Sequence, residues 1–162
     1  MAVSFVTTRC YFLAIFVTSA GALAFALILQ YGFGYEPCLL CRYQRIPYWT
    51  VVVLSAAALA VPGVDGRGVA WLVAGVFTCG SLLAFYHVGV EQHWWQAGAC
   101  ASQGNFPMSF GAFRDQPVAP IGKSCDAIDW ALFGLSMASY NAALSVMLTL
   151  GTAYAARSMI RG

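Results

Sequence analysis

Residues 11–30 read YFLAIFVTSAGALAFALILQ, a run of apolar, small and weakly polar residues that contains no charged side chain. An α-helix of this length rises about 30 Å, which is the thickness of the hydrocarbon core of a bilayer. The run therefore predicts a membrane-spanning helix over about 11–30 and indicates that the rest of the chain folds around it in lipid.

The composition of the whole chain points the same way. Of its 162 residues, 60% are hydrophobic and only 9% are charged, whereas a soluble domain carries about 25% charged residues. The length leaves room for about four spans and their loops, without a separate soluble domain. The net charge of +2 comes from scattered residues, which gives no basic run for binding nucleic acid. We therefore predict one integral membrane domain over residues 1–162, with no nucleic-acid partner.

Three further apolar runs cover residues 46–61, 69–86 and 131–156. The first of them is short for a span unless its helix begins earlier, near Leu39 or Arg42. The predicted fold is an all-α integral membrane protein, a four-transmembrane-helix bundle with helices over about 11–30, 42–61, 69–86 and 131–156. Two extracytoplasmic loops, about 31–41 and 87–130, join them. The second loop is long and apolar enough to lie partly on the membrane surface.

The basic residues near the ends of the spans predict that both termini are cytoplasmic. The short segments on the side of the termini carry Arg9, Arg67, Arg157 and Arg161, whereas the much longer outer loops carry Arg42, Arg45, Arg114 and Lys123. Cysteine usage supports this orientation, because four of the six cysteines fall in the two outer loops. Disulfides persist in an oxidising compartment outside the cytoplasm.

The strongest chemical signal is the stretch EPCLLCRYQR over residues 36–45. Cys38 and Cys41 can close a small, strained disulfide, and a loop so short gives redox lability rather than stability. Arg45 follows Cys41 by one helical turn, so we expect the two to share the first turns and one face of the second helix and Arg45 to favour the Cys41 thiolate. Because Pro47 is tolerated only in a first turn, this shared face depends on where the helix begins.

Cys100 and Cys125 enclose a longer loop that contains prolines. Their disulfide could stabilise the loop, or it could exchange with the thiols of another protein. If both outer cysteine pairs are only staples, the chain is a non-enzymatic four-helix membrane scaffold with disulfide-stapled outer loops. A metal site made by Cys38, Cys41 and a histidine is disfavoured, because a second cysteine pair at matching spacing is absent. We therefore predict no metal.

A third hypothesis is a conduit that carries reducing electrons outward across the membrane. Such a protein needs a cysteine pair facing the interior of the bundle, and Cys10 and Cys79 are the only candidates. The two lie far apart in depth in the predicted topology, and we expect them to be inert buried thiols.

The stretch PCLLCRYQR over residues 37–45, together with Cys125 and WALFGL over residues 130–135, resembles the DsbB family of bacterial inner-membrane disulfide-generating proteins. The resemblance covers the whole chain. It implies a protein-dithiol:quinone oxidoreductase that reoxidises a periplasmic thioredoxin-fold dithiol oxidase, a DsbA-like partner, and passes the electrons to a membrane quinone. The quinone, ubiquinone or menaquinone, is the implied cofactor. The implied location is the bacterial inner membrane, with several spans.

The resemblance also implies roles for individual residues. The reduced partner attacks the disulfide of Cys100 and Cys125, and Cys38 exchanges with this pair through a transient bond to Cys125. Cys41 is then left as a thiolate that faces the quinone, and Arg45 matches the family's quinone-site arginine. A guanidinium beside a thiolate stabilises its charge and can pair with an oxyanion that develops on the ring.

Three other polar residues near the outer membrane surface each have two possible roles. His87 and Glu91 are four residues apart at the outer end of the third predicted span, where they either line the quinone pocket or lie at the interface. Arg42 either tunes the thiolate or anchors the second helix among the headgroups.

Overall fold

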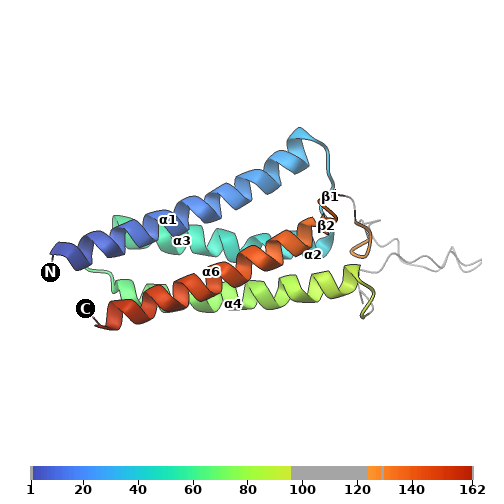
Figure 1. The fold of residues 1–162 in the computed structure, drawn as a ribbon. Coiled ribbons are helices and arrows are strands. Elements are labelled where there is room, and N and C mark those ends of the chain that lie inside the picture. The colour runs from blue at the N-terminus through green and yellow to red at the C-terminus, as the bar shows by residue number, and fades with distance from the viewer. Residues whose placement is uncertain (1, 96–123, 129, 162) are drawn as a thin grey trace, which may run out of the picture.

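The computed structural model describes residues 2–95, 124–128 and 130–161. Within these ranges, the chain forms four long helices that lie side by side (Figure 1): α1 (Ala2–Leu27), α3 (Arg45–Ala60), α4 (Gly66–Glu91) and α6 (Met137–Arg161). The first residues of α1 and the last residues of α6 lie at the same end of the bundle. The opposite end holds the short elements α2 (Leu39–Tyr43), β1 (Ala131–Leu132) and β2 (Leu135–Ser136).

Two helical segments among the described residues are long and apolar enough to cross a membrane. They are Thr8–Gly32, with a mean hydropathy of 2.4, and Gly66–Glu91, with 1.9. Large apolar side chains on their outer surfaces are exposed, such as Val17 at 59% and Leu82 at 66%. Lipid is the solvent that such a surface fits, because a soluble monomer rarely leaves large apolar patches open.

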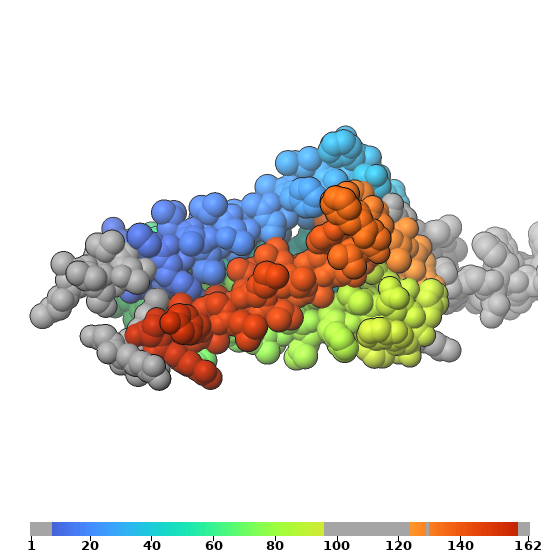
Figure 2. Space-filling model, in the orientation of Figure 1, coloured from blue at the N-terminus to red at the C-terminus, as the bar shows by residue number. Residues whose placement is uncertain are grey.

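The helices pack unevenly. Helix α1 packs mainly against α3, and α6 packs mainly against α4, while α1 and α6 scarcely touch. The main core cluster joins α1, α3 and α4 through six buried residues: Ile15, Leu23, Tyr48, Val51, Val73 and Phe77. Because α1 and α6 are not packed together, a hollow lies between them near β2, as Figure 2 shows.

The second helix is divided at Gln44 into α2 and α3. Cys38 caps α2, and its Sγ accepts a hydrogen bond from the Cys41 N–H at 3.2 Å. Pro47 lies in the first turn of α3, and it has no N–H to continue the hydrogen-bond ladder from α2. Gln44 itself keeps helical angles, φ −64° and ψ −16°. Cys41 and Arg45 thus lie in two consecutive helices, not in the first turns of one helix as predicted.

Several other helix ends differ from the predicted bounds: α1 begins at Ala2 and not at 11, α4 begins at Gly66 and not at 69, and α6 ends at Arg161 and not at 156. Helix α1 continues into a π-helical turn, η1 (Ile28–Gly32), two residues past the predicted end at 30. Helix α4 runs to Glu91 instead of ending at 86. His87 and Glu91 therefore lie on the last turns of a helix rather than in the predicted loop 87–130. Most of that loop, including Cys100, lies outside the described residues.

The fourth predicted helix begins at 131, but the structure has a short hairpin there. Strands β1 and β2 are antiparallel, with Leu132 opposite Leu135. Phe133 and Gly134 have positive φ values of 51° and 80°, as a two-residue type I′ turn requires. Helix α6 then begins at Met137, and the Ser136 Oγ accepts a hydrogen bond from the Ser139 N–H at 3.2 Å, as a helix cap does.

Candidate functional site

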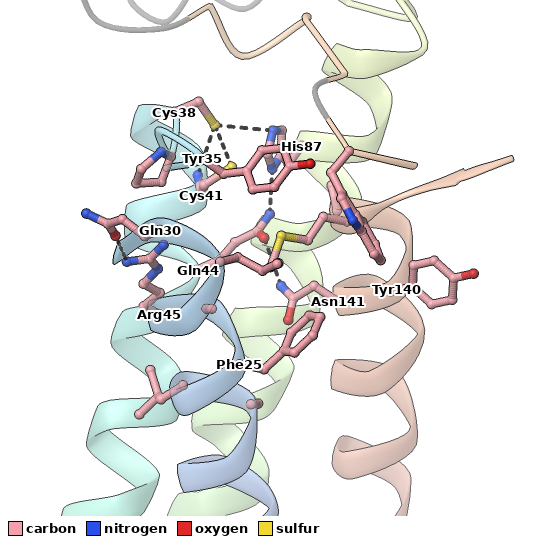
Figure 3. A pocket seen from close by; sticks show the side chains of 18 of the residues that line it. Phe25, Gln30, Tyr35, Cys38, Cys41, Gln44, Arg45, His87, Tyr140 and Asn141 are labelled. Atoms are coloured by element: carbon pink, nitrogen blue, oxygen red, sulfur yellow. Dashed lines mark hydrogen bonds between the residues drawn. The ribbon is translucent and has the colours of Figure 1, made fainter. Parts of the chain in front are cut away.

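A cavity of about 360 Å³ lies at the end of the bundle that holds α2. Its walls are mainly apolar and include Leu23 and Phe25 from α1, Leu29 from η1, and Ala138 and Leu144 from α6. Polar groups reach it from the segment 38–48, from α4, from η1 and from α6. Figure 3 shows Cys38, Cys41, Gln44, Arg45 and His87 gathered around this space. The cavity thus joins a reactive thiol pair to an apolar chamber.

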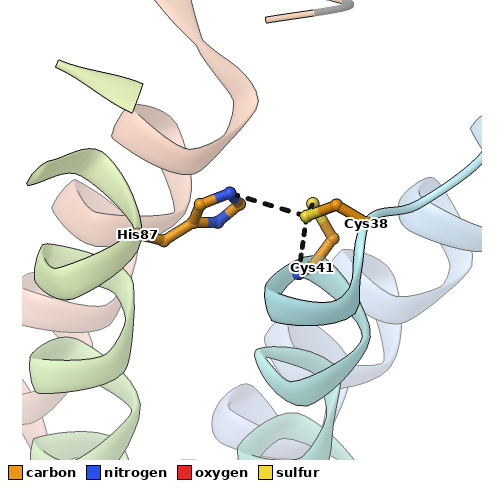
Figure 4. A group of neighbouring side chains, drawn as sticks. All are labelled: Cys38, Cys41 and His87. Atoms are coloured by element: carbon orange, nitrogen blue, oxygen red, sulfur yellow. Dashed lines mark hydrogen bonds between the residues drawn. The ribbon is translucent and has the colours of Figure 1, made fainter. Parts of the chain in front are cut away.

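Cys38 and Cys41 are free thiols whose sulfur atoms lie 2.8 Å apart. The Cys38 side chain is only 5% exposed. His87 reaches the pair from α4, with its Nε2 at 3.6 Å from the Cys38 Sγ (Figure 4). The site therefore holds a reduced dithiol that is largely shielded from water and has an imidazole against one sulfur.

The two sulfurs share one proton unequally. The hydrogen bond with Cys41 is the main cause that lowers the pKa of Cys38 to about 5, with further help from His87 and against the effect of burial. The pKa of Cys41 is raised, because its thiol donates to Cys38 and because it is buried. The hydrogen bond between the sulfurs therefore favours the thiolate on Cys38, and the expectation that Arg45 favours a Cys41 thiolate stays a prediction.

Arg45 instead contacts the end of α1. Its Nη1 donates a hydrogen bond to the Gln30 Oε1 at 2.5 Å. Gln30 lies in η1, and π-helical turns often occur at functional sites. Both residues line the cavity, so the guanidinium is held across the space from α3 to η1. In the sequence, Gln30 is marked only as a polar residue at the end of an apolar run.

His87 belongs to a buried chain of polar side chains that crosses three helices. The His87 side chain is 2% exposed, and its Nδ1 lies 2.9 Å from the Gln44 Nε2. The Gln44 Oε1 accepts from the Asn141 Nδ2 at 2.8 Å. The Tyr48 hydroxyl donates to the Asn141 Oδ1 at 2.7 Å. We call these four residues the polar relay; sequence reasoning missed Gln44, Tyr48 and Asn141 as site residues.

Glu91 lies one turn beyond His87 on α4. Its Oε1 is 3.8 Å from the His87 Nε2, and its other carboxylate oxygen accepts a hydrogen bond from the Ser136 hydroxyl. The residue is 8% exposed. The sequence allowed His87 and Glu91 either to line a pocket or to lie at the membrane interface. Both lie in the cavity wall.

Cys125 connects the second outer loop to this site. It is disulfide-bonded and 1% exposed. It packs in one buried cluster with Cys38, Leu40 and Val90, against which Cys41 also lies. The structure therefore brings Cys38, Cys41 and Cys125 together. Pairing of Cys125 with Cys100 stays a prediction, because Cys100 lies outside the described residues.

The ligand atoms of Cys38, Cys41 and His87 all lie within 4.8 Å of one another, a grouping that could hold a thiophilic metal ion. Two sulfurs bound tetrahedrally to Zn²⁺ at about 2.3 Å lie about 3.8 Å apart. The observed separation of 2.8 Å is much shorter. The geometry fits two sulfurs in direct contact, as in a redox-active Cys-x-x-Cys pair, better than it fits a metal cage.

Three residues weighed from the sequence lie away from the cavity. Cys10 and Cys79 are both exposed free thiols, so the expectation that they are buried is wrong. Neither faces the interior of the bundle, which removes the only candidates for an outward conduit of electrons. Arg42 is exposed and does not line the cavity.

Comparisons with known proteins agree with this geometry. The family model described as "Disulfide bond formation protein DsbB" matches residues 8–155. The chain is 30% identical to Disulfide bond formation protein B of Aromatoleum aromaticum over 164 residues, which cover 96% of this chain and 94% of the relative. It is 36% identical to the protein of the same name from Xanthomonas campestris pv. campestris over 159 residues, covering 91% and 89%.

A third relative shows the same likeness over a shorter stretch. Disulfide bond formation protein B of Haemophilus influenzae is 33% identical over 119 residues, which cover 71% of this chain and 67% of the relative. No solved structure shows a significant match. The family match includes the Cys38 and Cys41 pair, Cys125 and the four long helices that surround the cavity. From this match, and from the relatives that align along nearly its whole length, the chain belongs to the DsbB family of membrane proteins that form disulfide bonds.

Proposed function

We propose that the chain is a protein-dithiol:quinone oxidoreductase. It reoxidises a periplasmic, thioredoxin-fold, DsbA-like dithiol protein and passes the electrons to a quinone of the bacterial inner membrane. One observation carries this proposal: the disulfide-bonded Cys125 packs against Cys38 of a reduced pair, and that pair lines an apolar cavity. A thiol relay needs sulfurs in contact at one end and an electron acceptor at the other.

In the first half of the reaction, a partner thiolate attacks the loop disulfide that contains Cys125. One loop sulfur leaves as a thiolate, and the second partner thiol then resolves the mixed disulfide. The partner becomes a disulfide and the loop pair becomes a dithiol. We propose Cys100 as the attacked sulfur and as the bonding partner of Cys125. Each step breaks one sulfur–sulfur bond and forms another, so two electrons pass from the partner to the loop pair.

The second exchange moves these electrons to the membrane pair. The Cys125 thiolate attacks the Cys38 Sγ of a Cys38–Cys41 disulfide, and Cys41 leaves as a thiolate. While Cys38 is bonded to Cys125 it cannot hold the shared charge, so the main cause that raises the Cys41 pKa in the dithiol is removed. Attack of the other loop thiol on Cys125 then releases Cys38. The combination of an oxidised Cys125 with a reduced Cys38 and Cys41 is the one expected after these steps.

The cavity fits a quinone. Its volume of about 360 Å³ and its apolar walls suit a flat ring, and the sparse contact between α1 and α6 leaves a side on which an isoprenoid tail can meet lipid. A bound quinone, ubiquinone or menaquinone, would supply an acceptor of two electrons and two protons. Arg45 would balance negative charge on the ring oxygen, and His87 and Glu91 would hold protons near it.

The same proposal includes four membrane spans with both termini in the cytoplasm. The first residues of α1 and the last residues of α6 lie at the same end of the bundle, as this topology requires. The opposite end carries the Cys125 disulfide, which an oxidising periplasm preserves. Arg42, exposed on α2, would then lie at headgroup depth as an anchor.

The test is quinone consumption by the purified protein with its reduced thioredoxin-fold partner. We expect turnover to be lost in Cys41→Ser and to fall at least tenfold in Arg45→Ala, because one removes the electron donor and the other a charge that stabilises the reaction. Cys79→Ser, an exposed thiol away from the cavity, is the matched control and keeps its activity. A non-enzymatic scaffold predicts no quinone consumption in the parent protein, and turnover that survives Cys41→Ser contradicts the proposed route.

A further inference from the structure

The polar relay lies in an otherwise apolar interior. Three of its four members are buried, with Gln44 at 7%, Tyr48 at 4% and His87 at 2% exposure. A buried polar side chain is costly unless it is hydrogen-bonded. Each member of the polar relay is hydrogen-bonded to the next. The donor and the acceptor of every bond can therefore be assigned in turn, starting from the end farthest from the sulfurs.

That far end is the Tyr48 hydroxyl, which donates its single proton to the Asn141 Oδ1. The Ser145 Oγ lies 3.2 Å from the same hydroxyl and is left to donate to it. With its oxygen used in this way, Asn141 turns its Nδ2 toward the Gln44 Oε1. Gln44 must then present its Nε2 to the His87 Nδ1, at 2.9 Å.

An amide nitrogen donates hydrogen bonds and does not accept them. The His87 Nδ1 facing it must therefore be the acceptor, and the single proton of the neutral imidazole lies on Nε2. Nε2 faces the Cys38 Sγ at 3.6 Å and the Glu91 Oε1 at 3.8 Å. Both of these atoms are acceptors when ionised. The relay thus turns the N–H of His87 toward the side of the ring where negative charge is held.

We propose that Gln44, set in place by Asn141 and Tyr48, is a positioning residue that fixes His87 in its Nε2–H tautomer, with this N–H directed at the Cys38 thiolate. The catalytic meaning of this arrangement rests on the proposed function, whereas the tautomer itself does not. The other ionisable groups beside the ring are Cys41 from α2 and Glu91 from α4, and neither is hydrogen-bonded to Nδ1 within the described part of the chain.

Nitrogen NMR of the reduced, histidine-labelled protein tests this proposal. A His93→Asn background leaves His87 as the single histidine, and asparagine suits the positive φ of 59° at position 93. We expect an unprotonated Nδ1 and a protonated Nε2 in this parent. Gln44→Glu replaces the donor with a carboxylate that only accepts, so the Nδ1 resonance shifts to the protonated position. Gln44→Leu removes the partner and gives averaged resonances of both tautomers.

Ser145→Ala is the matched control, because Ser145 contacts only the oxygen of Tyr48 and sets no amide. It keeps the parent spectrum. A protonated Nδ1 in the parent, or an unchanged spectrum in Gln44→Glu, overturns the proposal. If Gln44→Glu does not fold, Asn141→Leu serves instead: it frees the Gln44 amide to rotate and should give mixed tautomers, and a parent-like spectrum there also overturns the proposal.

Quinone consumption by the same parent separates this inference from the proposed function. A parent that consumes no quinone but shows the expected tautomer refutes the function and leaves the positioning role. A parent that consumes quinone but keeps its tautomer when Gln44 is changed refutes the positioning role alone.

Discussion

Removal of the Cys41 thiol should raise the pKa of Cys38. The pKa of Cys38 is lowered from 9.0 to about 5, which corresponds to roughly 5 kcal/mol at about 1.4 kcal/mol per pKa unit. The hydrogen bond from Cys41 is the largest cause, and a hydrogen bond to a charged group contributes about 1.5–3 kcal/mol. In Cys41→Ala we therefore expect the pKa of Cys38 to rise by about one to two units, while His87 and burial stay as they are.

The assay is the rate of alkylation of Cys38 in the fully reduced protein, followed by mass spectrometry of its peptide from about pH 4 to about pH 9. Because the lowered pKa favours the thiolate, the parent reacts down to about pH 5 and loses reactivity below it. Cys79→Ala, which changes an exposed thiol, is the control and keeps the parent profile.

Three outcomes would refute this reasoning. The first is a parent profile for Cys38 with a midpoint near 9. The second is a profile in which Cys41, rather than Cys38, reacts at low pH. The third is a Cys38 profile in Cys41→Ala that matches the parent, which would show that the short contact between the sulfurs does not stabilise the charge.

Further changes address the cavity and the packing around it. Gln30→Leu removes the partner of Arg45, so we expect the quinone KM to rise about fivefold to tenfold, the effect of about 1 kcal/mol of lost orientation, with little change in Cys38 alkylation. Tyr48→Phe removes a buried hydroxyl from the relay and should lower the unfolding free energy in detergent by about 1–2 kcal/mol. Gly89→Ala places a Cβ against the Trp95 ring, so it should cost about 1–3 kcal/mol and shift the tryptophan fluorescence.

The changes on α3 and α4 each have a control on the same element. Thr50→Ala changes an exposed hydroxyl on α3 and should leave stability within about 0.5 kcal/mol. Gly75→Ala adds a Cβ on α4 where no atom lies within 4 Å and should cost nothing. An unchanged KM in Gln30→Leu, or equal losses in a variant and its control, would contradict the role assigned to the contact.

Features that depend on residues close together in the sequence could be predicted from it. The apolar run over 11–30 and the thiol pair in residues 36–45 are both readable, because span length and cysteine spacing are local properties. The hairpin at 131–136 was not predicted. Its apolar residues look like the start of a span, and only the positive φ values of Phe133 and Gly134 separate it from a helix.

The charge distribution of the site could be predicted only in part, because some of it depends on contacts between distant residues. The sequence places Arg45 near Cys41, but the nearest imidazole to the pair is His87, which comes from another helix. Gln44 and Asn141 look like ordinary polar residues until the packing of α3 and α6 brings them into hydrogen-bond distance. The hydrogen bond from Cys41 that mainly lowers the Cys38 pKa follows from local spacing, whereas the smaller effect of His87 and the polar contacts behind it depend on helix packing.

The burial of Cys38 and Cys125 also determines which reductants can reach the membrane pair. Thiol exchange requires an attacking thiolate to reach a sulfur directly, and Cys38 and Cys125 are 5% and 1% exposed. Charged thiols dissolved in the surrounding water therefore reach a Cys38–Cys41 disulfide slowly, whereas a small neutral alkylating reagent can enter through the apolar cavity that Cys38 and Cys41 both line. Under the proposed function, this burial slows unproductive reduction by such thiols and favours electrons that arrive from a bound protein partner.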